Sequence, residues 1–233
     1  MCVAAIAWQA RPRWQLVVIG NRDEFHQRPT APLAQWDNGI LAGRDLEAGG
    51  TWLGISPGRF ALVTNRQVEG YPRPGMASRG GLITSALLGE PSGDTAAMNP
   101  FNLITISPDA AALSSNYPRP QQRALAGGIH GLSNSSLDER WHKTMRLESG
   151  LAAWLQGQGT IEDLFSPLAD RLPDPARPEA FSSSVFIVNP AYGTRCSTVI
   201  AVDRDGAGTM IERSFDPAGQ PSGEVRLTFN WCG

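Results

Sequence analysis

Ionisable residues crowd together directly after an apolar run near the start of the chain. The run WQLVVIG covers residues 14–20, and the tetrapeptide NRDE follows at residues 21–24. Charged side chains are rarely buried without partners, so a cluster at the end of a predicted strand indicates a function or an ionic partner. A cysteine at position 2 is one candidate, because the reactivity of a thiol depends on nearby charge.

The first two predicted strands are expected to form a hairpin. With the polar segment Gln9–Arg13 as its loop, Trp8 faces Trp14, and counting back pairs Cys2 with Gly20. Neighbouring strands lie about 4.8 Å apart, so this register places Cys2 beside the start of NRDE. A register slip of one residue would exchange the two faces of the sheet.

The residues that follow Gly20 are therefore expected within side-chain reach of the cysteine. These are Asn21, Arg22 and Asp23, and the missing side chain of Gly20 leaves space at the thiol. Adjacent strand residues point to opposite faces, so Arg22 and Asp23 can line one pocket only if the chain turns there.

A cysteine at position 2 can serve as an N-terminal nucleophile. Removal of Met1 would leave Cys2 with a free α-amine, whose reference pKa of about 7.7–8.0 suits a general base. Arg22 would lower the thiol pKa, and Asp23 would orient the ammonium group. The alternative is that Cys2 is a small buried hydrophobic residue and that the charges cap a loop.

The composition predicts one folded domain over residues 1–233. The chain is 41% hydrophobic and 18% charged, which allows a sizeable core and argues against disorder. The formal net charge is −2 and Lys143 is the only lysine, so nucleic acid is not expected as a partner. No apolar stretch approaches the roughly 20 residues that a bilayer span needs.

The cysteines and the first residues bear on the compartment. Cys2, Cys196 and Cys232 are odd in number and have no paired spacing, so no disulfide framework is expected. The N-terminus has no basic region before its apolar run and does not resemble a signal peptide. A reducing cytoplasm is the expected location.

Hydrophobic patterning predicts an α+β fold with many strands and few helices. Strands are predicted at Cys2–Trp8, Trp14–Gly20, Gly50–Ser56, Arg59–Asn65, Phe101–Ser107, Gly128–Asn134, Phe181–Val188, Thr194–Asp203, Gly208–Phe215 and Glu224–Trp231. Helices are predicted around Leu82–Leu87, after a capping box at Ser136 and Glu139, and after Thr160. Asp203–Gly206 predicts a hairpin turn. Strands that are apolar at nearly every position indicate sheets covered on both faces.

Short motifs along almost the whole chain resemble those of the NRDE family, also called the transport and Golgi organisation family. They are Met1–Cys2, NRDE with Arg28–Pro29, GGTWLG at Gly49–Gly54, VTN at Val63–Asn65, SRG at Ser78–Gly80, HGLSN at His130–Asn134 with WHK following, and TRCSTVI at Thr194–Ile200. Each motif alone is weak, and their combination in this order is specific.

This family is similar to cysteine N-terminal nucleophile hydrolases such as penicillin V acylase. The resemblance implies a four-layer αββα sandwich. It also implies catalytic roles for Cys2 as nucleophile, Arg22 and Asp23 as the early arginine and aspartate, Asn65 in the oxyanion hole, Asn134 as a second asparagine, and Arg195. Two departures are that Arg22 and Asp23 are contiguous here, and that the chain is shorter than the acylases.

Two functions remain open from the sequence. One is hydrolysis of a small linear amide through an acyl-thioester on Cys2, with no cofactor. The other follows from the family's links to haem, lipid and acyl-CoA handling: a non-enzymatic carrier that uses the same pocket, with haem as a candidate ligand. Asn21, Trp52 and His26 are the expected ligand contacts.

No metal site is expected, because His26, His130 and His142 lack metal-ligand spacing. GISPG at Gly54–Gly58 fits a serine-hydrolase pattern, but Pro57 has no N–H for the oxyanion hole, so a hairpin turn is predicted instead. The oligomeric state is left open.

Overall fold

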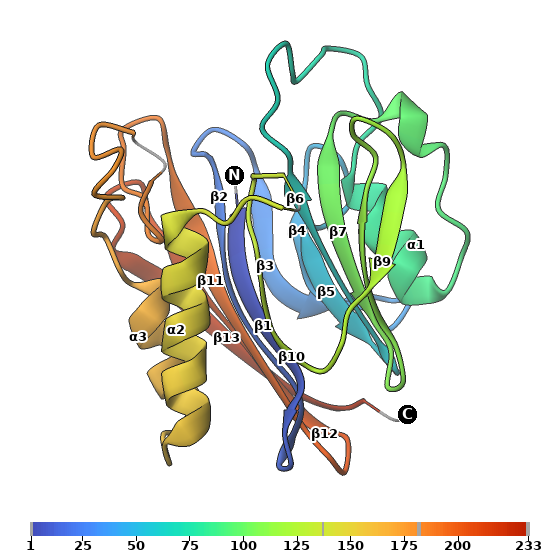
Figure 1. Ribbon diagram of the computed structural model, residues 1–233, viewed down its shortest axis with the longest axis vertical. Coiled ribbons are helices and arrows are strands. Elements are labelled where there is room, and N and C mark those ends of the chain that lie inside the picture. Colours follow the sequence, from blue (N-terminus) through green and yellow to red (C-terminus); the bar gives the residue numbers. More distant parts are fainter. Residues whose placement is uncertain (1, 137, 181–182, 232–233) are drawn as a thin grey trace.

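The computed structural model describes residues 2–136, 138–180 and 183–231, which fold mainly into antiparallel strands (Figure 1). In these residues the first sheet has six strands, in the order β10 (Gly128–Leu132), β1 (Cys2–Arg11), β2 (Trp14–Phe25), β11 (Tyr192–Asp203), β12 (Ala207–Phe215) and β13 (Pro221–Asn230). The second sheet has seven, in chain order: β3 (Thr30–Gln35), β4 (Leu41–Asp45), β5 (Leu53–Ser56), β6 (Arg59–Asn65), β7 (Phe101–Ile106), β8 (Ala111–Ser115) and β9 (Gln121–Ala124).

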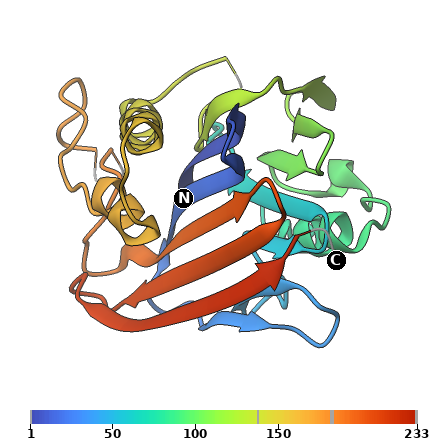
Figure 2. The same ribbon diagram turned by 90° about the horizontal axis from the view of Figure 1, so that it is seen from below.

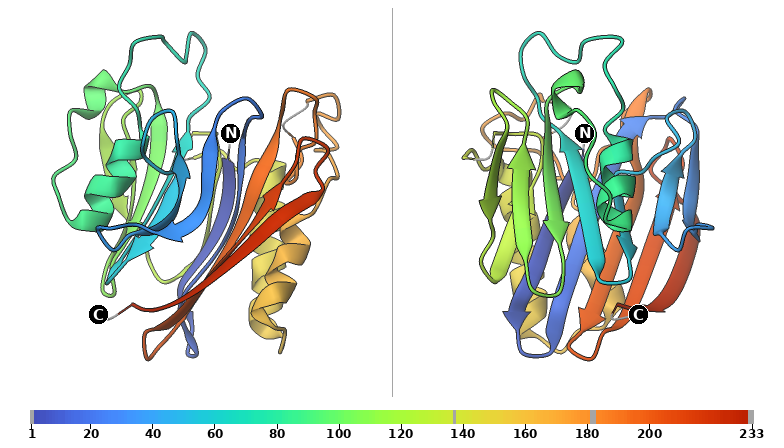
Figure 3. Two further views of the ribbon diagram at one scale, coloured as in Figure 1. Left: turned by 180° about the vertical axis from the view of Figure 1, so that it is seen from behind. Right: turned by 90° about the vertical axis from the view of Figure 1, so that its right-hand side faces the viewer.

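The two sheets pack face to face, and the helices lie outside them. Helix α1 (Gly80–Leu88) covers the second sheet, whereas α2 (His142–Gln156) and the short α3 (Phe165–Leu168) cover the first. Figure 3 shows α1 and α2 on opposite outer sides, and Figure 2 shows α2 and the second sheet on opposite sides of the first. The predicted α+β class with stacked sheets is confirmed.

Burial on both faces explains the continuous apolar pattern of β1. Ala4 and Ile6 point between the sheets, where they meet Leu62 and Ile104 of the second sheet. Val3 and Ala5 alternate with them and point toward the helices, as period-2 geometry requires.

The predicted register of the first hairpin is wrong by two residues. Cys2 pairs with Arg22 instead of Gly20, because β1 continues to Arg11 and a bulge intervenes after Trp8. Gln9 in that bulge has a positive φ of 48°, and the turn shrinks to residues 12 and 13. A shift of two residues preserves the faces, so the inference that Cys2 lies beside NRDE is confirmed.

Other boundaries also differ from the sequence-based prediction. Strands β3, β4, β8 and β9 were not predicted; β9 is exposed throughout, so it lacks the alternation that marks a half-buried strand. Residues 181–182 of the predicted 181–188 strand lie outside the described residues. The rest is irregular apart from a bridge at Val188. The Phe186 amide donates to the Asp170 carbonyl and the Ile187 amide to the Thr194 hydroxyl, so these amides are not used in strand pairing.

Helix α2 starts at His142, so the predicted capping box at Ser136 and Glu139 does not begin it. Thr160, after which the third helix was predicted, forms a capping box with Asp163 and begins a 3₁₀ turn at Ile161–Leu164. The hairpin at Asp203 is also confirmed, with the Asp203 carboxylate accepting from the amides of residues 205 and 207.

Two glycines fix the position of α1. A Cβ on Gly50 would lie 2.6 Å from the carbonyl carbon of Gly80, and one on Gly80 would lie 3.1 Å from the Cα of Gly50. The loop before β5 and the first residue of α1 are therefore in backbone contact. This contact brings the residues before α1, Ser78 and Arg79, to the edge of the sheet sandwich.

We predict that Gly50→Ala destabilises the fold by about 1–3 kcal/mol, because the backbones must separate to admit the methyl group. Urea denaturation followed by circular dichroism measures this loss. Gly81→Ala is the matched control: a Cβ added there would meet no atom within 4 Å, so the helix should be unchanged or slightly more stable. Equal stability of the Gly50 variant and the control would contradict the contact.

Candidate functional site

Cys2, Arg22 and Cys196 lie side by side on β1, β2 and β11. Arg22 pairs with Cys2 on one side and with Cys196 on the other, and cross-strand partners share a face of the sheet. All three line a cavity of ≈ 680 Å³ whose other walls come from β12 and β13 of the same sheet, from the second sheet and from nearby loops. Both cysteines are free and buried.

Gly20 and Trp52 form part of this arrangement. A Cβ on Gly20 would lie 3.0 Å from the outer ring carbon of Trp52, so the indole occupies the space that the glycine leaves. Trp52 lines the cavity and also packs on the core between the sheets. The sequence analysis expected the space beside Gly20 to lie open at the thiol, but the Trp52 ring fills part of that space.

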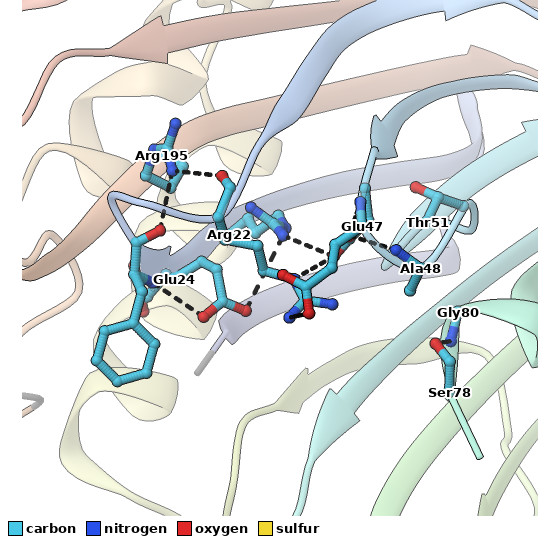
Figure 4. Close-up of polar contacts among 12 residues, drawn as sticks. Arg22, Glu24, Glu47, Ala48, Thr51, Ser78, Gly80 and Arg195 are labelled. Atoms are coloured by element: carbon cyan, nitrogen blue, oxygen red, sulfur yellow. Dashed lines mark hydrogen bonds and ion pairs between the residues drawn. The ribbon is translucent and has the colours of Figure 1, made fainter. Parts of the chain in front are cut away.

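Arg22 is held by carboxylates from both sheets (Figure 4). Its Nη2 donates to Asp45 of β4 at 3.2 Å and lies 4.0 Å from Glu24 of its own strand. Arg28 donates its Nε to the same Asp45 oxygen at 2.6 Å. Burial opposes ionisation of Asp45, but the hydrogen bonds from Arg28 and the Ala48 amide and the charges of Arg28 and Arg22 together outweigh it, so the pKa of the carboxyl falls below its usual value. The Arg22 residue is only 8% exposed.

Asp23 points its carboxylate to the opposite face of β2. Its Oδ1 accepts from the Thr194 hydroxyl at 2.7 Å, and its backbone oxygen accepts from the Tyr192 hydroxyl at 2.8 Å. Adjacent strand residues thus point apart as expected, yet both border the cavity, since the site lies near the end of the strand. Burial raises the pKa of the Asp23 carboxyl, and the nearby Lys143 lowers it.

Lys143 is a site residue that the sequence analysis missed. It is 1% exposed on α2, and its Nζ has no hydrogen-bond partner among the described residues. Burial lowers the pKa of its ammonium, while the charges of Asp23 and of the Cys2 thiolate act in the opposite direction. The sequence did contain a signal for its burial. The sole lysine lies four and eight residues before Leu147 and Leu151, which places it on the buried face of the helix.

The two thiols differ in their surroundings. Burial raises the pKa of Cys2 and the charge of Asp23 adds to that effect, whereas the charge of Arg22 and a hydrogen bond from the Asp23 backbone lower it. Burial raises the pKa of Cys196 well above its usual value, and the neighbouring Glu212 raises it further. Glu212 is itself buried, and its Oε1 accepts from the Leu33 amide at 2.7 Å. Cys2 is therefore the more readily ionised of the two, and Cys232 lies outside the described residues.

The two asparagines occupy different positions. Asn65 ends β6, is exposed and lines the cavity. Asn134 is fully buried, and its Nδ2 donates to the backbone oxygen of Asn65 at 2.6 Å. The neighbouring Ser133 hydroxyl donates to the backbone oxygen of Cys2 at 3.0 Å. Asn134 thus fixes the backbone at Asn65, while the Asn65 side chain is the one at the cavity.

Arg195 holds the loop after β2 in place. Its Nη1 donates to the backbone oxygens of residues 25, 26 and 28 at 3.0–3.1 Å, and the residue also lines the cavity (Figure 4). His26 in that loop shares a 3.0 Å hydrogen bond with the Asn189 oxygen and is not part of the cavity lining. Asn21 points to the helical side, where its Nδ2 donates to the oxygens of Leu168 and Val185. Of the expected ligand contacts, only Trp52 borders the cavity.

The family model for Transport and Golgi organisation 2 matches residues 1–217. The chain belongs to this family. It is 33% identical to the human Transport and Golgi organization protein 2 homolog, with 92% of this chain and 93% of that protein covered. It is 31% identical to the mouse homolog over 92% of this chain and 93% of that protein. Its identity to the Drosophila melanogaster protein is 28%, over 94% of this chain and 95% of that protein. The resemblance inferred from the motifs is confirmed.

Membrane-crossing helices and metal clusters are both absent from the described residues. No helix among them has the length and apolar character needed to cross a membrane. No group of three or more His, Cys, Asp or Glu side chains in those residues could hold a metal ion.

We predict that Arg22→Gln moves the pH profile of Cys2 alkylation to higher pH. Arg22 lowers the thiol pKa by favouring the thiolate, so loss of its charge raises that pKa and a higher pH is needed for the same rate. Rates of iodoacetamide labelling, mapped to the Cys2 peptide between pH 6 and 10, measure the shift. Arg11→Gln, at the exposed far end of β1, should leave the profile in place; a profile unmoved in both variants would contradict this role.

Proposed function

We propose that this chain is an N-terminal nucleophile hydrolase that cleaves a small linear amide through an acyl-thioester on Cys2. The observation that carries the proposal is the pairing of Cys2 with a buried arginine at the wall of a cavity large enough for a small ligand. The stacking of two antiparallel sheets with helices outside is compatible with the sandwich of such hydrolases.

The reaction begins with removal of Met1, which frees the α-amine of Cys2. This amine takes the thiol proton, and the sulfur attacks the carbonyl carbon of the amide to give a tetrahedral oxyanion. The Asn65 amide, at the end of β6 in the cavity lining, would donate to that oxyanion. The ammonium then returns its proton to the leaving amine, and water, deprotonated by the same α-amine, hydrolyses the thioester.

The charges around Cys2 would assist at defined points. Arg22 favours the thiolate, and Asp23, whose charge acts on the Cys2 thiol, lies near enough to stabilise the ammonium formed on the same residue. Lys143, on the far side of Asp23, favours the ionised form of that carboxyl and so opposes the effect of burial, which raises its pKa. Glu24 and Asp45 hold Arg22 in place, and Asn134 fixes the backbone that carries Asn65.

A second candidate is a non-enzymatic carrier of a hydrophobic ligand in the same cavity. One observation favours it: the Cys2 side chain is buried, and burial raises the pKa of its thiol, which favours the protonated, less reactive sulfur. Trp52 would supply apolar surface to a lipid, an acyl thioester or haem. A carrier needs neither the thiolate nor the free amine, so chemistry at Cys2 separates the two candidates.

We predict that the mature protein begins at Cys2 and that this thiol reacts with iodoacetamide faster than Cys196. The α-amine supplies a base to Cys2 alone, whereas Glu212 and burial suppress ionisation of Cys196. Intact-mass measurement reports the first residue, and peptide mapping assigns the label. Retention of Met1 in protein that hydrolyses amides would exclude this mechanism.

We predict that Cys2→Ser lowers amide hydrolysis at least about 100-fold, the scale of losing a covalent nucleophile, while the fold is retained. The measurement is turnover of a panel of N-acyl p-nitroanilides, with mass spectrometry of acid-quenched protein for the acyl-enzyme. Cys196→Ser is the matched control and should keep both turnover and the acyl adduct. Full turnover by the Cys2 variant, or ligand binding without any turnover in the unmodified protein, would favour the carrier.

A further inference from the structure

The cavity beside Cys2 is lined by both carboxylates and arginines, and most of them are paired with one another or with the backbone. The acidic lining residues all have polar partners: Asp23 with Thr194, Glu24 and Asp45 with Arg22, Glu47 with Arg28, Glu212 with the Leu33 amide, and Glu224 with Arg213. Because these acidic groups already have polar partners in the protein, those of the described lining do not need a cation from the ligand to compensate them.

The arginines that line the cavity differ in whether they have a carboxylate partner. Arg22 and Arg28 have carboxylate partners, whereas Arg44, Arg79 and Arg195 have none within 4.0 Å among the described residues. Arg195 is satisfied by backbone oxygens of the loop after β2. Arg44 is exposed, lies over the Trp36 ring and donates to the Gly49 oxygen.

Arg79 differs from these two. It is partly buried at the cavity wall, and within the described part of the chain its guanidinium makes a single hydrogen bond, 3.3 Å long, to the oxygen of Pro100. Burial lowers its pKa, and the charge of a Cys2 thiolate acts on it in the opposite direction, so the two residues share one electrostatic environment. The N–H groups that this partly buried cation does not use among the described residues can bond to an acceptor that a ligand supplies.

The fold holds Arg79 where a ligand would meet it. The Gly50–Gly80 backbone contact fixes the position of Arg79, which directly precedes Gly80. Figure 4 shows Ser78 and Gly80, which flank Arg79, on the opposite side of Arg22 from Arg195. The Nη1 of Arg22 also has no hydrogen-bond partner in the described part of the chain. The cavity therefore offers guanidinium donors from two arginines without matching acceptors.

We propose that Arg79 binds a carboxylate of the ligand beside Cys2, so that the substrate is an amide carrying a carboxylate. The reaction part rests on the proposed hydrolysis, whereas binding of the carboxylate needs no catalysis. A guanidinium suits this group because it can donate two parallel hydrogen bonds to a carboxylate.

Two small alkylating reagents test the subsite without knowledge of the substrate. Iodoacetate and iodoacetamide form the same bond to sulfur, but iodoacetate carries a carboxylate where iodoacetamide carries a neutral amide. The quantity measured is the ratio of their rates at Cys2, by peptide mapping at fixed pH and low ionic strength, with glutathione as the free-thiol reference. Taking this ratio cancels changes in thiol pKa that a substitution causes.

The ratio at Cys2 should exceed that of glutathione, and Arg79→Gln should lower it about fivefold, the order expected for one partly buried charge contact. Arg79→Lys should retain most of the preference. Arg73→Gln is the matched control, because Arg73 is an exposed arginine of the preceding loop that does not line the cavity, and it should leave the ratio unchanged. An unchanged ratio in Arg79→Gln, with Cys2 still reactive, would overturn the carboxylate subsite and leave the nucleophile intact.

A second measurement separates the two proposals. If Cys2 reacts with neither reagent, the nucleophile assignment fails, and calorimetric titration with N-acetylglycine then decides the subsite. Binding to the unmodified protein that disappears in Arg79→Gln and persists in Arg73→Gln supports it. Equal binding by both variants, or no binding to the unmodified protein, overturns it.

Discussion

The buried cation of Arg22 is the constraint around which the site is built. A guanidinium between two apolar sheets must be neutralised, and Asp45 of the second sheet together with Glu24 of β2 does so. Because Asp45 and Arg22 belong to different sheets, their ion pair ties the sheets together at the cavity. Cys2 pairs directly with Arg22, so the geometry that stabilises the cation also sets the surroundings of the thiol.

The other face of β2 carries a second buried polar network. Asn21 anchors the strand to the segments beneath it through bonds to the oxygens of Leu168 and Val185, and its own oxygen accepts from Ser197 at 2.6 Å. Asp23 continues this face with Thr194 and Lys143. One short strand segment therefore directs alternate polar residues to two sides of the sheet, and each side compensates its own charges.

The reactivity of the Cys2 thiol depends on the groups around it more than on the cysteine itself. Burial alone would make Cys2 an inert thiol, and Arg22 works against that effect. The α-amine released from Met1 would add a base that Cys196 lacks. Under the carboxylate-subsite proposal, Arg79, which has no carboxylate partner among the described residues, would give the cavity a preference for negatively charged ligands that neither thiol could supply.

The sequence by itself determined the family, the α+β class with stacked sheets, and the proximity of Cys2 to Arg22, because local patterns and hairpin counting report on neighbours along adjoining strands. The tertiary structure decided the register, since the bulge after Trp8 has no local signal that separates it from a longer loop. It also decided the partners Asp45, Lys143 and Arg79. These residues come from β4, α2 and the segment before α1, and only packing of separate elements brings them to Cys2 and Arg22.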